Sequence, residues 1–196
     1  AEPAAAVIKH NNPCGAAVAA TLEAAARAGM EGDPQSAFGA VLGFNRVVDR
    51  ATAEYLCAPG LFVEAIVAPE FEPAALEILT TRPKWKANVR LMAIGTLAAP
   101  NSRDYRRIDG GLLVQDADNE ADLESEWRVV TSVSPSDRQL GDLRFGWSIV
   151  RCVKSNAIVV CKDRTLCGAG AGQMSRVDSV EIALRKAESR LAGCVL

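Results

Sequence analysis

The chain has 196 residues, of which 49% are hydrophobic and 23% charged, and its formal net charge is −2. This composition is typical of a globular protein with one large domain or two small ones, and it excludes a disordered chain. The small net charge gives no general attraction to nucleic acid or to an anionic membrane. An anionic ligand would therefore be held by local groups.

The sequence contains neither a signal peptide nor an apolar run near the roughly 18 residues needed to span a bilayer. Six cysteines are scattered without a Cys-x-x-Cys pair, and several lie inside apolar runs. Free cysteines in such runs behave as small hydrophobic residues, which favours a reducing compartment over a disulfide framework. We therefore expect a cytoplasmic protein without a membrane or nucleic-acid partner.

Short apolar runs alternate with helical patterns along the chain, which predicts an α/β layer structure. In the first half, the patterns predict strands at 5–8, 36–48, 61–69 and 88–94, and helices at 16–28, 51–57 and 72–79. A further strand is expected over 106–115. The acidic stretch 116–126 is interpreted as a solvated connection.

The second half gives clearer patterns. Ser134 and Pro135 predict the start of a helix over 135–152, because serine is a preferred N-cap and proline fits the first helical position. The stretch NAIVVCKDRTLCGAG predicts two strands around Asp163. A second helix is expected over roughly 176–191, opened by a capping box at Ser175.

His10 is the only histidine in the chain, and it lies beside Lys9 at the end of the first predicted strand. A turn over residues 11–15 would present both side chains at a sheet edge, a common place for ligand sites in α/β proteins. A neighbouring ammonium favours the neutral imidazole, which can accept a proton near pH 7. For these two residues alone, a solvated pair at a strand end remains the simpler interpretation.

Three further positions combine polarity or small size with apolar surroundings. Phe38 followed by Gly39 could line a pocket for a flat heteroaromatic ligand, or could simply feed a buried strand. Glu64 interrupts an apolar run, so it either binds a ligand or marks the exposed side of a half-buried strand. Asn156 could hold a polarised carbonyl, although asparagine is also common in turns.

The segment CGAGAGQMSR (167–176) has small residues before a predicted helix, a pattern that can bind an anion, with Arg176 adding a charge-assisted contact. A tight turn between a strand and a helix is the alternative. No Gly-Lys-Ser/Thr follows, and no strand with a terminal acid follows, so neither a Walker loop nor a dinucleotide fingerprint is complete. Pro13-Cys14 matches half of a zinc-deaminase signature, but residue 17 is alanine and no His-x-Glu exists. We expect no catalytic zinc.

Five segments together resemble the formyltransferase domain of the AICAR transformylase/IMP cyclohydrolase family. They occur in that family's order and spacing and cover nearly the whole chain: VIKHNNPCGAAVA, DPQSAFGAVLGFNRVVD, FVEAIVAPEFEPAALEIL, LRFGWSIVRCVKSNAIVVCKD and GAGQMSRVDSVEIA. The resemblance implies two lobes of cytidine-deaminase-like α/β architecture, layered with mixed sheets and without zinc. The first lobe would cover 1–94, connecting strands and an acidic linker 95–127, and a truncated second lobe 128–196.

The resemblance also implies an activity, which is transfer of a formyl group from 10-formyltetrahydrofolate to the 5-amino group of AICAR, giving FAICAR. The family forms homodimers with active sites at the subunit interface. Lys9, His10 and Asn156 match its catalytic residues. Residues matching its substrate-binding positions are Phe38, Gly39, Glu64, Gln173, Ser175 and Arg176. Potassium could bind near Val150, Val153 and Ser155.

The chain also departs from the family pattern. The family's Arg-Tyr-Gly…Asn-Pro-His-Gln segment before the Lys-His pair is absent, as are its Asp-Ala-Phe-Phe-Pro, Pro-Gly-Gly-Ser and Arg-His-Phe segments near the end. We therefore expect a partial chain that needs further segments for turnover. The alternative is a non-catalytic remnant that binds a nucleotide or serves in oligomerisation. The presence of Lys9, His10 and Asn156 together favours the enzyme.

Overall fold

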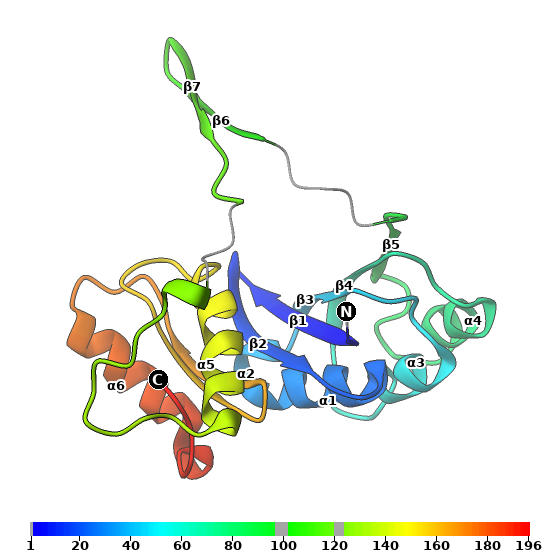
Figure 1. Ribbon diagram of the computed structural model, residues 1–196. Helices are drawn as coiled ribbons and strands as arrows, with labels where there is room; N and C mark the ends of the chain where they lie inside the picture. The colour runs from blue at the N-terminus through cyan, green and yellow to red at the C-terminus, as the bar shows by residue number, and fades with distance from the viewer. Residues whose placement is uncertain (1, 97–101, 120–123) are drawn as a thin grey trace. The chain divides into compact units, whose positions relative to one another are not determined.

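The apolar runs of the sequence form one mixed sheet of seven strands in the computed structural model, which describes residues 2–96, 102–119 and 124–196 (Figure 1). The strand order is β5 (Arg90–Ala93), β4 (Val63–Ala68), β3 (Ala40–Phe44), β1 (Ala4–Lys9), β2 (Asn12–Val18), β9 (Thr165–Gly170) and β8 (Ile158–Lys162). Neighbours in β3–β4–β5 run parallel, and the remaining pairs are antiparallel.

Helices connect these strands, and most begin at a side-chain cap that satisfies otherwise unpaired backbone N–H groups. They are α1 (Leu22–Gly32), α2 (Pro34–Ala37), α3 (Arg50–Leu56), α4 (Pro73–Thr81), α5 (Asp137–Val150) and α6 (Arg176–Ala187), followed by the short 3₁₀ helix η2 (Glu188–Arg190). The caps of α1, α3 and α6 are Thr21, Asp49 and Ser175. Within the described ranges, no helix is long and apolar enough to cross a membrane.

The start of α5 differs from the prediction. Ser136 is the N-cap, not Ser134, and it exchanges hydrogen bonds with Gln139 in a capping box. Pro135 therefore lies before the helix and not at its first position. A capping box satisfies two free N–H groups at once, which favours Ser136 over Ser134 as the N-cap. The helix therefore begins at Asp137 and not at residue 135.

The prediction for residues 16–28 was wrong in its first part. Residues 16–18 complete β2, and the helix begins only at Leu22 and continues to Gly32. Alanine has high helix propensity, but β2 pairs along its length with β1, and these tertiary contacts override the local preference. The glycine and proline residues over 29–35 predict a loop, but this segment contains the end of α1 and the start of α2.

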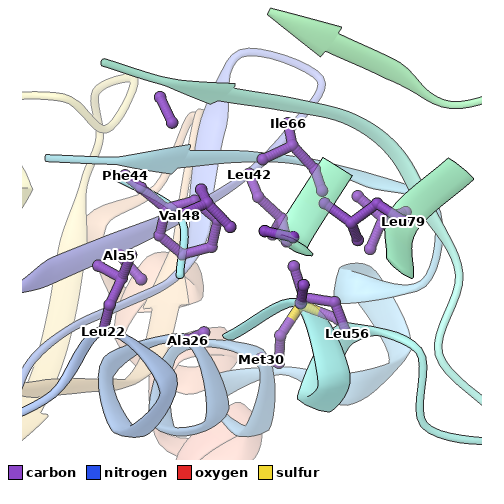
Figure 2. Close-up of a cluster of buried hydrophobic side chains, with 14 of the residues drawn as sticks. Ala5, Leu22, Ala26, Met30, Leu42, Phe44, Val48, Leu56, Ile66 and Leu79 are labelled. Carbon is purple, nitrogen blue, oxygen red and sulfur yellow. The ribbon is translucent and has the colours of Figure 1, made fainter. Parts of the chain in front are cut away.

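The larger core lies between the sheet and the helices α1, α3 and α4. Figure 2 shows Leu42 and Ile66 from the strands facing Leu56 and Leu79 from the helices, and all four are almost fully buried. Deleting one such side chain typically costs 2–5 kcal/mol. This core holds β1, β3 and β4 rigidly and thereby fixes the ends of those strands.

Strands β8 and β9 are covered on both faces. Cys161 faces a cluster that includes Phe145 and Ile149 of α5, whereas its neighbour Val160 packs with Ala183 of α6. This is the alternation expected of a strand with two buried faces. The α/β architecture and the mixed sheet are confirmed; that its halves correspond to two cytidine-deaminase-like lobes stays a prediction.

Contacts along the chain divide it into two units, Ala1–Gly95 with Pro135–Leu196 and, separately, Thr96–Ser134. The second unit contains a hairpin of β6 (Arg103–Ile108) and β7 (Gly111–Asp116), and a 3₁₀ turn η1 (Glu124–Glu126). The single strand predicted over 106–115 is thus two antiparallel strands. Of the predicted acidic connection, residues 116–119 and 124–126 are mostly exposed, while 120–123 lie outside the described residues.

Candidate active site

The candidate residues gather at one edge of the sheet because of the strand directions. β1 ends there and β2 begins there, since the two form an antiparallel hairpin. β3 also begins there because it runs antiparallel to β1. β9 runs antiparallel to β2, and β8 to β9, so β9 ends and β8 begins at this same edge. We call it the polar edge. It carries residues 9–12, 38–39, 154–156 and 171–176.

The turn between β1 and β2 consists of His10 and Asn11. Both have left-handed backbone conformations, with φ of 49° and 66°, and the flanking Lys9 and Asn12 pair across the hairpin. Two left-handed residues are what a two-residue hairpin turn of type I′ requires. The turn is thus shorter than the predicted turn over 11–15, because residues 12–18 belong to β2. It exposes the imidazole of His10 to solvent.

Lys9 binds backbone and not a carboxylate. Its Nζ donates to the carbonyl oxygens of Phe38 at 2.9 Å and of Gly39 at 3.0 Å. A cationic donor shared by two carbonyls is a strong contact, and it ties the end of β1 to the segment that leads into β3.

Position 39 requires glycine because of both its backbone conformation and the side chain that lies next to it. Its φ is +69°, and an added Cβ would lie 3.0 Å from the ring of Phe62. The Gly39 N–H donates to the Phe62 carbonyl at 2.8 Å, which fixes the segment against β4. The ring of Phe38 lies 5.3 Å from that of Phe62 and is 59% exposed, so Phe38 is not a core residue.

Both phenylalanine rings line a mainly apolar pocket of about 300 Å³. Its other lining residues are Met30, Glu31, Pro34, Ala37, Tyr55, Ala58, Pro59, Gly60 and Leu61. An apolar pocket with exposed aromatic surface can hold a flat ring, with few polar groups to set its orientation. A flat ligand beside Phe38 is therefore sterically possible in this structure.

At the polar edge, Asn156 holds the segment that leads from β9 into α6. Its Nδ2 donates to the carbonyls of Gln173 at 2.9 Å and Met174 at 3.0 Å, and its backbone N–H donates to Gln173 as well. Its own carbonyl accepts from the Ser179 hydroxyl at 2.9 Å. Both amide hydrogens are thus used, and within the described part of the chain the Oδ1 atom has no donor. The side chain can still accept a hydrogen bond from a ligand.

The glycine-rich segment is explained by packing. Gly168 and Gly170 lie in β9, and a Cβ at either would come within 2.2 Å and 2.0 Å of the carbonyl oxygens of Ala183 and Ser179 in α6. Only glycine lets the strand and helix approach so closely. Gly172 is different, because it lies past the end of β9 with φ of +66° and little around it.

Residues 173–176 lead from β9 into α6 at the polar edge. Gln173 donates through Nε2 to the Ala171 carbonyl at 2.9 Å, and Ser175 caps α6 by accepting from the Asp178 N–H. Arg176 is exposed, and its guanidinium makes no ion pair with any residue that the structure describes. Gln173 and Ser175 thus have local structural roles, while Arg176 is available to a ligand.

Glu64 is paired. Its Oε1 lies 2.6 Å from Nη1 of Arg90 on the neighbouring strand β5, and both side chains are partly exposed. It occupies the start of β4, which begins at the polar edge because β4 runs parallel to β3. The pair explains how a carboxylate is tolerated in this apolar run, and it leaves Glu64 accessible.

Cys14 lies close to the Lys-His turn but is not a nucleophile. Its thiol donates to the Val7 carbonyl at 3.4 Å, and burial, followed by the nearby Asp33 carboxylate, raises the pKa of Cys14 to about 11. The reactive form of cysteine is the thiolate, so this thiol is inert at neutral pH. Among the described residues, no group of three or more His, Cys, Asp or Glu side chains could hold a metal ion.

Sequence reasoning missed Asn12. Its Oδ1 accepts a hydrogen bond from the backbone N–H of Lys154 at 3.0 Å, although the two residues are 142 positions apart. The pair of asparagines after His10 was visible, but only the folded sheet brings residue 154 to the hairpin. No local pattern contains that information.

The sequence matches the family model described as AICARFT/IMPCHase bienzyme over residues 1–186. Curated relatives include a bifunctional purine biosynthesis protein PurH from Rhodopirellula baltica, 58% identical over 100% of this chain and 38% of that protein. PurH proteins from Persephonella marina and Synechococcus elongatus are 46% and 44% identical, over 95% and 98% of this chain. The chain spans 35–38% of the length of these three relatives. With the family model matching nearly its whole length, the chain belongs to the AICARFT/IMPCHase bienzyme family.

Proposed function

We propose that this chain carries the formyl-transfer site of AICAR formyltransferase and acts in purine biosynthesis. The substrate would be AICAR, the formyl donor 10-formyltetrahydrofolate, and the product FAICAR. The observation that carries the proposal is the meeting of the Lys9–His10 turn and the Asn156 segment at one sheet edge, joined through Asn12 and Lys154. The cyclohydrolase chemistry of the same family has no residues assigned to it here.

The reaction needs a proton carrier. The AICAR amine is a weak nucleophile because its lone pair is delocalised into the ring and the carboxamide. As its nitrogen bonds to the formyl carbon, it must lose a proton, and the departing folate nitrogen must gain one when its bond to that carbon breaks. His10, exposed on the turn, would accept the first proton and return it to the folate nitrogen, ending unchanged.

Asn156 and Lys9, the other two catalytic candidates, would position the reacting groups and stabilise the developing negative charge. Asn156 would accept a hydrogen bond through its free Oδ1 and keep the reacting groups in register. Lys9 already donates to two carbonyls, so its role would be to hold the Phe38–Gly39 segment and to add positive charge near the developing oxyanion.

Substrate contacts would come from both sides of the polar edge. Phe38 and Gly39 would line the pocket for the AICAR ring, and Glu64 would accept hydrogen bonds from the nucleotide. Arg176 would bind an anionic group of a substrate, supported by Gln173 and Ser175 in the same segment. These assignments rest on matching family positions and on the exposure of Phe38 and Arg176.

We also propose that the chain binds a potassium ion, forms a homodimer and acts in the cytoplasm. Potassium prefers oxygen ligands, and the segment around Val150, Val153 and Ser155 offers a hydroxyl and backbone carbonyls. The Val150 carbonyl already accepts from the Val153 N–H at 3.0 Å, so the fit is through the remaining oxygens. The homodimer would complete each active site at its interface.

The test is tetrahydrofolate release that depends on AICAR, measured for this chain alone and for the chain joined to the flanking segments found in its relatives. We expect FAICAR from the extended protein. If the extended protein binds AICAR in calorimetry but forms no FAICAR, the alternative of a non-catalytic nucleotide-binding or oligomerisation remnant replaces the enzyme.

A further inference from the structure

Asn12 connects the Lys9–His10 end of β1 to the segment Lys154–Asn156 at the polar edge. Its Oδ1 accepts from the backbone N–H of Lys154 at 3.0 Å, and its Nδ2 lies 3.4 Å from the carbonyl of His10. The orientation of the carboxamide follows from chemistry, since an N–H can bond only to the oxygen and a carbonyl only to the NH₂ group. The side chain thus contacts both segments that carry the candidate catalytic residues.

Lys154 extends this contact through its backbone. Its N–H bonds to Asn12, and its carbonyl accepts from the Gly172 N–H at 2.7 Å. Two residues later, Asn156 binds Gln173. A displacement of Lys154 would therefore move the Asn156 carboxamide and the segment leading into α6 together.

The backbone pairing between β2 and β9 does little at this end of the strands. In the described part of the chain it consists of Ala17 opposite Thr165 and a hydrogen bond from the Val18 N–H to the Arg164 carbonyl at 3.1 Å. Both lie at the end of β2 that is remote from the polar edge. Near the edge, the Asn12 side chain takes the place of ladder hydrogen bonds.

We propose that Asn12 is a positioning residue, which holds the Asn156 segment in register with the Lys9–His10 turn so that His10 and Asn156 act on one substrate. The inference rests on the proposed formyl transfer and assigns Asn12 no contact with substrate. Rate is sensitive to such register, because a misplacement of about 1 Å can cost about 100-fold. Binding of AICAR through other residues should depend on Asn12 much less.

The variants separate positioning from simple stabilisation. Asn12→Ala removes both contacts, Asn12→Asp keeps an acceptor for the Lys154 N–H, and Asn11→Gly is the matched control on the turn. Glycine tolerates the left-handed φ of residue 11, and the Asn11 side chain makes neither contact. If Asn12→Ala does not fold, Asn12→Ser serves as the second variant, because its short polar side chain cannot bridge the two segments.

Activity is measured on the chain extended with its relatives' flanking segments. We expect kcat to fall about 10- to 100-fold in Asn12→Ala, with the KM for AICAR within about threefold, and recovery of most of kcat in Asn12→Asp. Asn11→Gly should match the wild type. An unchanged kcat in Asn12→Ala, or an Asn12→Asp variant as slow as Asn12→Ala, overturns the inference.

Hydrogen exchange of the Lys154 amide gives a readout that does not depend on turnover. Exchange should be at least about tenfold faster in Asn12→Ala than in the wild type and should return toward the wild-type rate in Asn12→Asp, because only the former loses the acceptor. Equal exchange in all variants overturns the inference. An inactive wild type with the expected exchange pattern would instead reject the proposed function and leave the Asn12 contact intact.

Discussion

Two segments at the polar edge, His10–Asn12 and Gly168–Gly172, differ in what explains their sequences. The segment His10–Asn12 is polar, and its Asn12 side chain accepts a hydrogen bond from Lys154, which precedes β8. The segment Gly168–Gly172 has the composition of a phosphate loop, yet its first two glycines are explained by close packing of β9 against α6. Small residues beside a helix therefore indicate close packing before they indicate a ligand. At the turn, by contrast, the exposed His10 side chain is free for chemistry.

The largest expected effect on stability tests the packing side of this contrast. Gly170→Ala places a methyl group 2.0 Å from the Ser179 carbonyl oxygen, so the free energy of unfolding should fall by about 3 kcal/mol. Gly172→Ala is the control, since it meets only the left-handed φ and should cost about 1 kcal/mol. Chemical denaturation measures both. Equal losses would show that the two glycines have the same role.

Arg190 anchors the same region and should have the next largest effect. Its Nη2 donates to carbonyls of Gly32 and Cys167 at 2.7 and 2.8 Å, and its Nη1 to Glu31 at 2.7 Å, so it joins the end of α1 to β9. Arg190→Met should lower the free energy of unfolding by about 2 kcal/mol, because hydrogen bonds from a charged donor to these carbonyls, and to those of Lys186 and Ala187, are lost. Arg185→Met, on the exposed side of α6, should change it by less than about 0.5 kcal/mol. Similar losses in the two variants would contradict the anchor.

The buried Cys167 thiol, in β9 next to α6, should make the stability of the fold sensitive to alkaline pH. Burial, with the neighbouring Cys194 thiol adding to it, raises the pKa of Cys167 to about 11, against an ordinary value of 9.0. Because the folded pKa lies above the unfolded one, the thiol's contribution to stability is complete below pH 9 and is lost as pH rises toward 11. Denaturation midpoints should therefore fall across that window, and less steeply in Cys167→Ala. A Cys167→Ala profile parallel to that of the wild type would contradict this cause.

The smallest expected change in stability concerns Glu64. Its pair with Arg90 is exposed, so Glu64→Gln should cost less than about 1 kcal/mol. If Glu64 also binds the nucleotide, the KM for AICAR should rise severalfold while the unfolding curve hardly moves. Arg90→Gln, which breaks the same ion pair, provides the control. An equal KM change in both variants would assign the effect to the pair and not to Glu64.

The sequence was sufficient where a local pattern determines the structure. The strand predicted over 61–69 and the helices predicted over 51–57 and 72–79 are confirmed as β4, α3 and α4. The structure shows that an apolar run, the Asp49 cap and Pro73 act locally in these three elements. Residues 16–18 were misassigned because alanine favours helix, whereas pairing with β1 decides the outcome. The candidate residues Lys9, His10 and Asn156 were named from motifs, but the contact that joins their segments depends on sheet order.

In the proposed formyl transfer, the exposed His10 imidazole on the β1–β2 turn carries the proton. The most direct measurement compares FAICAR formation by the extended protein with its His10→Ala variant. We expect kcat to be lower by about 100-fold or more in His10→Ala, because loss of a general base typically costs that much. Unfolding midpoints should not change, since the side chain is exposed. A His10→Ala variant that forms FAICAR at the wild-type rate would contradict this role of His10.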